Sequence, residues 1–218
     1  MSLRESEPST RATLVRFDGV ERAAHWVSAV MITVLIVTAI PLYYGSLFGL
    51  VLARIDVEQV HLWTGIALPV PLAVAALGPW GRRLRRDVRR VNEWTRAEIS
   101  WITSWGRIDI DADKFNPGQK LNAVVVAASS VILFATGVIL KWFDLFPVSW
   151  RGGSTFVHDL FAWVIVAVVL GHVYMALTHR EALSSMLRGR VSERWAARHA
   201  PRWLSERETR QSDREPSV

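Results

Sequence analysis

The sequence predicts an all-α integral membrane protein, a bundle of four transmembrane helices with an amphipathic segment between the second and third helices. Half of the 218 residues are hydrophobic, and several stretches of about 20 residues carry no charged side chain, which is the length that spans a bilayer. The arginines behind the pI of about 10.4 lie almost wholly outside these stretches. This separation favours a membrane protein, and we expect no nucleic-acid binding because no groove-reading element is left over.

The four predicted spans follow one another with Trp residues near several of their ends, as is typical of interfacial aromatics. The first span contains Pro41, which predicts a kink. The spans are residues 26–52, 62–80, 121–140 and 160–177, and the predicted domains are a polar tail at 1–15, a four-helix domain at 16–195 and a charged tail at 196–218. We expect the charged tail to be mobile.

The distribution of Lys and Arg predicts the orientation in the membrane. Residues 81–119 carry nine of these side chains, and residues 178–218 also carry nine. The short connections between the other spans carry only Arg54, Lys141 and Arg151, whereas the N-terminal tail carries Arg4, Arg11, Arg16 and Arg22. The positive-inside rule therefore places both termini and residues 81–119 in the cytoplasm. The first 24 residues lack an apolar core, so we expect no cleavable signal peptide.

The segment 81–119 places Trp94, Trp101 and Trp105 among charged residues, at spacings of 7 and 4. This spacing is typical of an amphipathic helix that lies on the membrane surface or docks a partner. A solvated basic loop with isolated aromatic residues is the alternative.

The chain contains no cysteine. Disulfides, thiolate-held iron–sulfur clusters and covalent haem attachment through C-x-x-C-H are therefore excluded. Any metal or redox centre must use His, Met, Tyr or carboxylate ligands, or belong to another chain.

Four of the six histidines lie near the ends of predicted spans, whereas His179 and His199 are expected at the surface. His158 and His172 are 14 residues apart on the fourth span, which places them about 40° apart around a helix and about 21 Å apart along it. The predicted orientation puts His158 at the outer side and His172 at the inner side. Depth alone then pairs His25 with His172, and His61 with His158.

Two pairs of imidazoles at two depths predict two b-type haems, each held by one imidazole on either side of its iron. A single histidine in a span is more often a hydrogen-bonded packing residue or part of a proton path. A zinc site would need its ligands at one depth, whereas these fall into two groups. Gly137 and Gly171 would allow a flat ring to approach the backbone, or serve helix packing instead.

Three stretches resemble a known family: RFDGVERAAHW at 16–26, KFNPGQK at 114–120 and FVHDLFAWVIVAVVLGHVYMAL at 156–177. They resemble the cytochrome b (gamma) subunit of respiratory formate dehydrogenase, within the di-haem membrane cytochrome b family shared with hydrogenase cytochrome b subunits. The sequence departs from the family at VTAIP in the first span, where many members place a glycine.

The resemblance implies that His25, His61, His158 and His172 ligate the iron of two haems b, in the pairing that depth predicts. It also implies a quinone pocket at the cytoplasmic side, with menaquinone or ubiquinone as the electron acceptor. Arg22 and Lys120 are alternatively suited to neutralise haem propionates. The residues predicted for the pocket are Asn116, Gly118, Gln119 and Lys120, although Asn-Pro-Gly is also a strong turn signal before a helix.

The function that the resemblance implies is that of a membrane-anchor electron-transfer subunit in the bacterial inner membrane. Electrons would come from a periplasmic-side iron–sulfur beta subunit that accompanies a molybdenum or tungsten catalytic alpha subunit, and the chain itself would not oxidise formate. Three alternatives remain: a cytochrome b subunit of a nickel–iron hydrogenase, a standalone di-haem cytochrome b, and a transporter that uses intramembrane histidines as a proton or metal relay.

Overall fold

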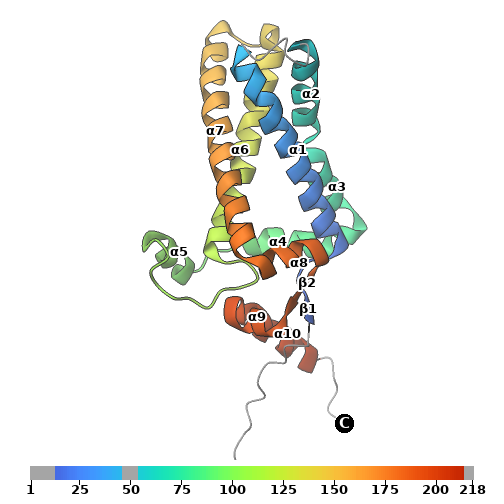
Figure 1. Cartoon of the computed structure of the whole chain (residues 1–218), viewed down its shortest axis with the longest axis vertical. Helices are drawn as coiled ribbons and strands as arrows, with labels where there is room; N and C mark the ends of the chain where they lie inside the picture. The colour runs from blue at the N-terminus through green and yellow to red at the C-terminus, as the bar shows by residue number, and fades with distance from the viewer. Residues whose placement is uncertain (1–12, 46–53, 214–218) are drawn as a thin grey trace, which may run out of the picture.

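The computed structural model describes residues 13–45 and 54–213, and it confirms an all-α membrane bundle (Figure 1). In the described part of the chain, four helical stretches are long and apolar enough to cross a membrane. They are α1 (Gly19–Tyr43), α2 (Arg54–Ala67) continued by α3 (Pro69–Leu77), α6 (Pro117–Lys141) and α7 (Val148–Thr178).

The helices extend beyond the predicted apolar spans. α7 begins at Val148 rather than near residue 160, and α2 begins at Arg54 rather than near residue 62. His158 and His61 therefore lie inside helices, not at their first residues. The reason is that hydropathy locates the apolar part of a helix, whereas polar residues such as Gln59 and Ser154 continue the helix beyond it. Residues 46–52 of the predicted first span lie outside the described residues, as do Arg4 and Arg11.

Prolines and capping residues set the helix boundaries. The second span divides at Leu68 because Pro69 stands at the first position of α3, where a missing N–H costs least. Pro41 falls in the last turn of α1, so that helix ends two residues later. Capping boxes begin both α1, through Asp18 and Glu21, and α6, through Asn116 and Gln119.

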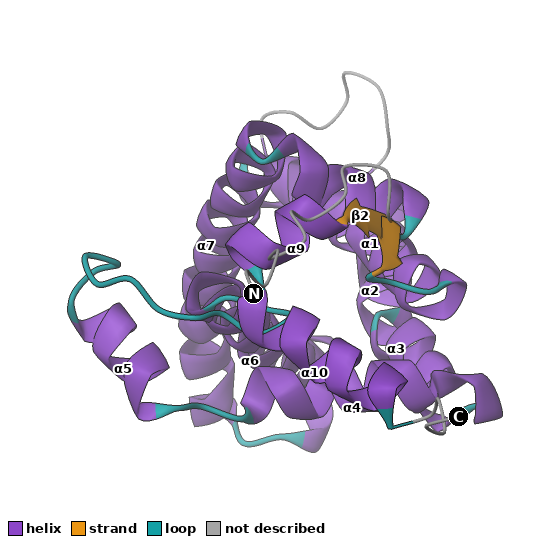
Figure 2. Cartoon of the chain, turned by 90° about the horizontal axis from the view of Figure 1, so that it is seen from below, coloured by secondary structure: helices purple, strands orange, loops and turns teal. Residues whose placement is uncertain are grey.

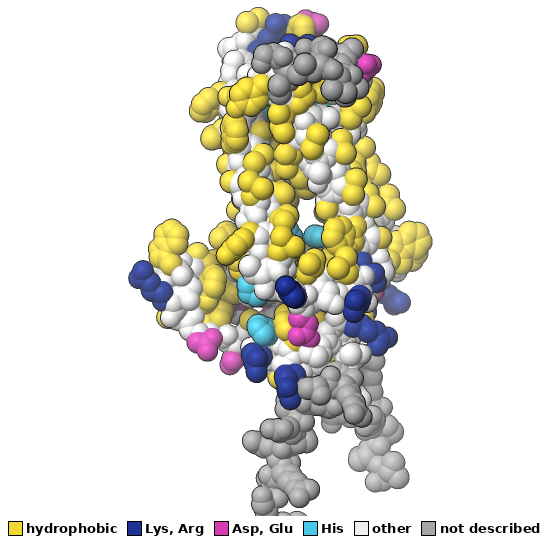
Figure 3. All heavy atoms as spheres, viewed as in Figure 1, with side chains coloured by type: hydrophobic (Ala, Val, Ile, Leu, Met, Phe, Trp, Pro, Cys, Tyr) yellow, Lys and Arg dark blue, Asp and Glu magenta, His cyan; other side chains and the backbone are white. Residues whose placement is uncertain are grey.

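The bundle consists of two helical hairpins that pack against each other (Figures 1 and 2). In one hairpin α1 packs on α2 and α3, in the other α6 packs on α7, and α2 contacts α6 across the two. Large apolar side chains point outward from the middle of the bundle, as the space-filling view shows (Figure 3); Val131 is 69% exposed and Leu170 is 65% exposed. Such a surface is stable in lipid, where outward apolar side chains carry no hydrophobic penalty.

The end of the bundle that we call the base carries most of the remaining described helices: η2 (Pro79–Gly81), α4 (Arg82–Asn92), α5 (Arg96–Thr103), α8 (Arg180–Arg188), α9 (Glu193–His199) and α10 (Pro201–Ser212). There β1 (Thr13–Val15) pairs antiparallel with β2 (Arg190–Ser192). Gly189 precedes β2 with φ of +83° and closes α8, a conformation that favours glycine. At the opposite end, η3 (Phe143–Leu145) connects α6 to α7.

The C-terminal segment is folded over residues 196–212, so the expectation of a mobile tail is wrong there. Ala196, Ala200 and Trp203 are almost fully buried and form a small core with Val191 of β2. The tail composition is charged, but a few apolar side chains at helical spacing suffice to hold α9 and α10 on the base.

The segment between the second and third spans forms two helices rather than the single amphipathic helix that the Trp spacing suggests. The backbone is extended between α4 and α5, and Trp94 lies in that connection. Thr95 then begins α5 through a capping box with Glu98. Trp105 follows α5 in a left-handed turn with φ of 57°. The alternative of a solvated basic loop with isolated aromatic residues does not hold for α4 and α5, which are helical, whereas residues 104–116 connect α5 to α6 without helix or strand.

Candidate functional site

The first histidine pair joins His61 of α2 to His158 of α7. The centroids of the two imidazole rings lie 6.4 Å apart, and the ring planes are inclined at 59°. Both side chains are half-buried. The structure thus brings together two histidines that the sequence assigns to different spans at the same depth.

Two threonines determine how the rings of this pair are presented. Thr38 Oγ1 lies 2.8 Å from His61 Nδ1, and Thr136 Oγ1 lies 2.9 Å from His158 Nδ1. Each hydroxyl also donates to the carbonyl four residues earlier in its own helix, at 2.7 Å in both cases. Because a hydroxyl has one proton, it must accept from the imidazole Nδ1–H. Nε2 of each histidine is then the unprotonated nitrogen, able to bind a metal.

The second histidine pair joins His25 of α1 to His172 of α7. The ring centroids lie 6.1 Å apart, with the planes inclined at 55°. Trp26 contacts the His25 ring edge-on, with centroids 5.4 Å apart. His172 is exposed, whereas His25 is half-buried. Within the described ranges, neither ring has a hydrogen-bond partner from the protein.

Both spacings fit two imidazoles bound on opposite sides of one metal ion. Metal–nitrogen bonds of about 2 Å put the centres of two such rings about 6 Å apart. The 14 positions between His158 and His172 separate the two pairs by about 21 Å along α7. Among the described residues, no group of three or more His, Cys, Asp or Glu side chains is placed to hold a metal. Each pair therefore offers the two imidazoles that a bis-histidine haem iron takes, whereas a tetrahedral zinc site takes three or four protein ligands at one place.

The other two histidines lie at the surface, and the two glycines near the histidine pairs make no close contact. His179 and His199 are exposed at the base, as predicted. A Cβ on Gly137 would lie 3.5 Å from His158 Cε1, an ordinary contact, and a Cβ on Gly171 would meet no atom within 4 Å. Contacts among the described residues therefore require neither glycine, and their role beside a flat ring stays a prediction.

The residues predicted for a quinone pocket lie at the start of α6. The Asn116 side chain accepts from the Gln119 backbone N–H at 2.9 Å, and the Gln119 side chain accepts from the Asn116 N–H at 3.1 Å. Gly118 faces the Trp101 ring, 3.7 Å from the position of a Cβ. The motif thus caps the start of α6, and this cap uses the side-chain oxygens of both amides. No described residue accepts a hydrogen bond from either NH₂ group, so both can donate to a ligand.

Lys120 and Arg22 both bond to protein groups. Lys120 is 3% exposed, and its ammonium lies 2.7 Å from a Glu98 carboxylate oxygen and 2.8 Å from the Glu93 carbonyl. Burial raises the pKa of Glu98, but hydrogen bonds from Lys120 and from Thr95 bring that pKa below its usual value. Arg22 donates to the carbonyl oxygens of Met186, at 3.2 Å, and Leu187, near the end of α8.

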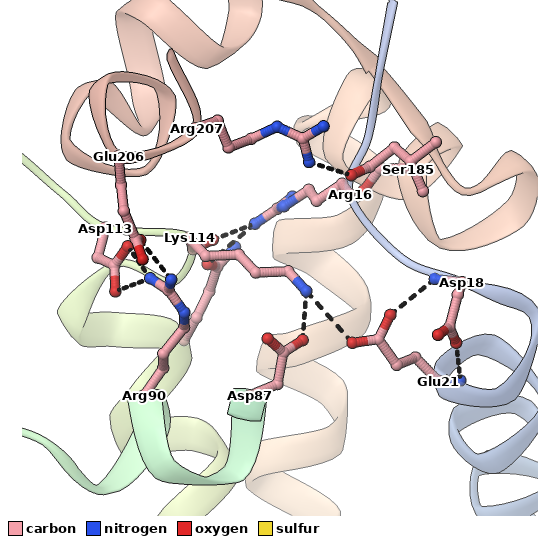
Figure 4. Close-up of polar contacts among 12 residues, drawn as sticks. Arg16, Asp18, Glu21, Asp87, Arg90, Asp113, Lys114, Ser185, Glu206 and Arg207 are labelled. Carbon is pink, nitrogen blue, oxygen red and sulfur yellow. Dashed lines mark hydrogen bonds and ion pairs between the residues drawn. The ribbon is translucent and has the colours of Figure 1, made fainter. Parts of the chain in front are cut away.

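A buried ionic cluster lies at the base, and the sequence did not indicate it (Figure 4). Lys114 extends between two carboxylates, bonding Asp87 of α4 and lying 3.3 Å from Glu21 of α1. All three side chains are nearly inaccessible. Burial raises the pKa of Asp87 to about 7, and the hydrogen bond with Glu21 contributes to this rise. The positive charge of Lys114 opposes the rise only in part, because the one ammonium is shared between two carboxylates.

Arg16 completes this cluster from the strand side. It is 3% exposed and donates to the Lys114 carbonyl at 2.8 Å and to Ser185 Oγ at 3.3 Å. Burial lowers its pKa to about 10, partly opposed by the charge of Asp87. The cluster joins the start of α1 to α4, α8 and the segment before α6, and Glu21 lies one helical turn from His25 on α1.

Sequence reasoning missed Thr38, Thr136 and Asp87. The two threonines lie 23 and 22 positions from their histidines, and Asp87 lies 27 positions from Lys114. None of these contacts follows a local spacing rule. The usable signal was chemical: metal-binding histidines generally require a hydrogen-bond acceptor for the second ring nitrogen, and each preceding helix offers a threonine.

Comparison with known proteins gives consistent matches over most of the chain. The family model described as prokaryotic cytochrome b561 matches residues 16–189. The chain is 25% identical to the nitrate-inducible formate dehydrogenase cytochrome b556(Fdn) subunit of Escherichia coli K12, covering 93% of this chain and 95% of that protein. It is 24% identical to the formate dehydrogenase cytochrome b556 subunit of Haemophilus influenzae, over 92% and 86% of the two chains. The cytochrome b556(fdo) subunit of E. coli formate dehydrogenase is 26% identical, over 90% and 94%.

Proposed function

From the premise that this chain belongs to the prokaryotic cytochrome b561 family, and so binds haem b and transfers electrons in a membrane, we propose that it is the di-haem gamma subunit of a formate dehydrogenase. The observation that carries this proposal is the pair of opposed imidazole couples, with ring centroids 6.1 and 6.4 Å apart, at two levels of one bundle. His25 and His172 hold one haem iron, and His61 and His158 hold the other.

The chain's own residues hold and orient the cofactors. Haem b, when bound, supplies reversible one-electron chemistry. Thr38 and Thr136 fix the Nδ1–H tautomer of His61 and His158, so that the unprotonated Nε2 of each ring would be able to bind a haem iron. α7 supplies one ligand to each pair, which keeps the two centres on a single rigid element.

The base is the cytoplasmic face in this proposal, with both termini on that side. Support comes from the arginines and lysines that gather on the base elements, including nine side chains in residues 81–119. The His61–His158 pair is then nearer the periplasm. Electrons enter there from an iron–sulfur beta subunit, which receives them from a molybdenum or tungsten alpha subunit. The support for these partners is that the relatives are formate dehydrogenase subunits.

The acceptor in this proposal is a membrane quinone that binds at the base beside His172. His172 is the exposed member of its pair, and the amide NH₂ groups of Asn116 and Gln119 are donors suited to a quinone carbonyl. Gly118 lies beside these amides and against the Trp101 ring. Lys120 fits the role least well, because its ammonium is buried against Glu98. Arg22 is correspondingly the better placed of the two cations for a propionate.

A pyridine haemochrome assay on the purified full chain, produced with ample haem supply, tests the proposal. We expect two haems b per chain in the wild type, and one in each of His158→Ala and His172→Ala. His199→Ala is the matched control and keeps two, because that ring lies at the surface. Two haems retained in both His158→Ala and His172→Ala would contradict the ligand assignment. Co-purification with a nickel–iron subunit in place of a molybdenum or tungsten subunit would contradict the formate dehydrogenase assignment.

A further inference from the structure

A polar cavity lies between α4 and α10 at the base, apart from both histidine pairs. It has a volume of about 820 Å³, within the range of ligand pockets. Seven arginines and three carboxylates line it, so positive charge dominates the walls. In the space-filling view, lysine and arginine side chains gather around the lower part of the molecule, below the apolar belt (Figure 3).

Two of the three carboxylates of this α4–α10 cavity form ion pairs with arginines of the same cavity. Arg90 binds Asp113 through both carboxylate oxygens, at 2.5 and 2.7 Å, and also binds Glu206. Glu206 in turn accepts from Arg210. These contacts tie α4 to α10 at the wall of the cavity.

Five arginines of the cavity have no carboxylate partner in the part of the chain that the structure describes, and one of them, Arg85, donates instead to the carbonyl oxygens of Ala76 and Gly78. Arg82, Arg86 and Arg89 stand on one face of α4, three or four positions apart, and Arg202 faces them from α10. The pKa of neighbouring Arg207 is lowered by burial and by the like charge of Arg83. Guanidinium groups that converge from two helices repel one another unless an anion lies between them.

We propose that the α4–α10 cavity binds the phosphate groups of an anionic molecule, with a phospholipid head group that carries two phosphates as the occupant. Guanidinium groups bind phosphate oxygens in a bidentate manner, and four of them supply enough donors to engage two phosphates. α4 begins two residues after Trp80, which is exposed at the end of the second span. The cavity is therefore next to the level of the lipid head groups.

The arrangement differs from the general excess of positive charge on cytoplasmic loops. That excess requires no mutual placement of the side chains. Here arginines from segments more than a hundred residues apart in sequence face one concave site. Arg180 and Arg188 of α8 are examples of such unconverged positive charge. Both are exposed at the same end of the molecule, and they line neither this cavity nor the smaller one beside it.

Calorimetric titration of the full chain, delipidated in neutral detergent, tests the proposal. Three probes are used: a short-chain phospholipid with two phosphates, phosphatidylcholine of the same chain length, and inorganic pyrophosphate. We expect saturable binding of the two-phosphate lipid, weakened about tenfold or more in Arg86→Gln/Arg89→Gln and by rising salt. Arg180→Gln/Arg188→Gln should leave that affinity within about twofold.

The remaining outcomes decide the source of the phosphate or overturn the site. Pyrophosphate that binds as tightly as the lipid, and is lost in the same variant, assigns the cavity to a free phosphate compound. Equal binding of phosphatidylcholine, or equal losses in the two double variants, overturns the proposal. Circular dichroism checks folding, and Arg202→Gln on the facing helix replaces the α4 variant if that variant is misfolded.

Discussion

The two histidine pairs are alike in spacing but differ in what surrounds them. At the His61–His158 pair, neutral hydroxyls from α1 and α6 bond the second nitrogen of each ring. At the His25–His172 pair, no described side chain bonds either ring, and the neighbouring polar groups are charged: Glu21 of the ionic cluster lies one turn along α1. One pair is therefore oriented from within the bundle, whereas the other depends on how the base holds α1 against α7.

This difference teaches that a common ligand pattern can be supported in two ways. Hydroxyl support involves one side chain for each ring and orders little else, because each threonine is already bonded to its own helix. Support from the base involves several elements, because Lys114 joins α1 to α4 through two buried carboxylates. Disturbing the first should affect one centre, and disturbing the second should affect the assembly of the base.

The largest effect is expected for Lys114→Met. Removing the ammonium leaves the buried Asp87 and Glu21 carboxylates without the cation that bonds both of them, which costs about 3–5 kcal/mol. Thermal unfolding in detergent should show a large loss of stability, with the His25–His172 centre lost before the His61–His158 centre. Lys141→Met, at an exposed site on the other end of α6, is the control and should behave as wild type. Unchanged unfolding of Lys114→Met would show that the cluster does not support the base.

A smaller and more local effect is expected for Thr38→Val and Thr136→Val. Loss of a hydrogen bond to the second nitrogen of a metal-bound histidine typically weakens metal binding by about 10–100-fold. Haem transfer to excess apomyoglobin should therefore accelerate for one haem per chain and stay constant for the other. Thr33→Val is matched, because Thr33 makes the same bond to its own helix without contacting a histidine. Equal haem loss in Thr33→Val and Thr38→Val would remove the distinction between the two pairs.

The smallest effect is a pH dependence at the base. Asp87 has a pKa of about 7 in the folded chain against 3.8 when exposed, so the folded state holds this proton more tightly. The stability that Asp87 contributes therefore falls as pH rises from about 4 to about 7, and is constant above that. Asp87→Asn resembles the protonated form, so its melting temperature relative to wild type should rise between pH 5 and pH 7.5, by on the order of 1 kcal/mol in stability. A constant difference across this range would show that Asp87 keeps an ordinary pKa.

Local patterns predicted much of the fold and the candidate site. The apolar stretches located the four spans because lipid imposes a minimum length on each. Depth and the 14-residue spacing on α7 paired the four histidines, and the structure brings those pairs together. The first residues of the helices were harder to predict. α2 and α7 extend beyond their apolar parts, because helix formation does not require apolar residues. The sequence analysis also missed that α9 and α10 are folded, since their folding depends on the packing of Trp203 in a small core with Val191 of β2.

The sequence by itself determined that this chain crosses a membrane with helices and carries imidazoles at two depths, because length, hydropathy and helical periodicity are properties of each segment alone. Only the tertiary structure decided which hydroxyl faces which ring, that Lys114 lies between Asp87 and Glu21, and that α4 and α10 turn their arginines toward one cavity. Those contacts depend on the rotation of each helix about its own axis. That rotation is set by packing between helices, and a single segment does not encode it.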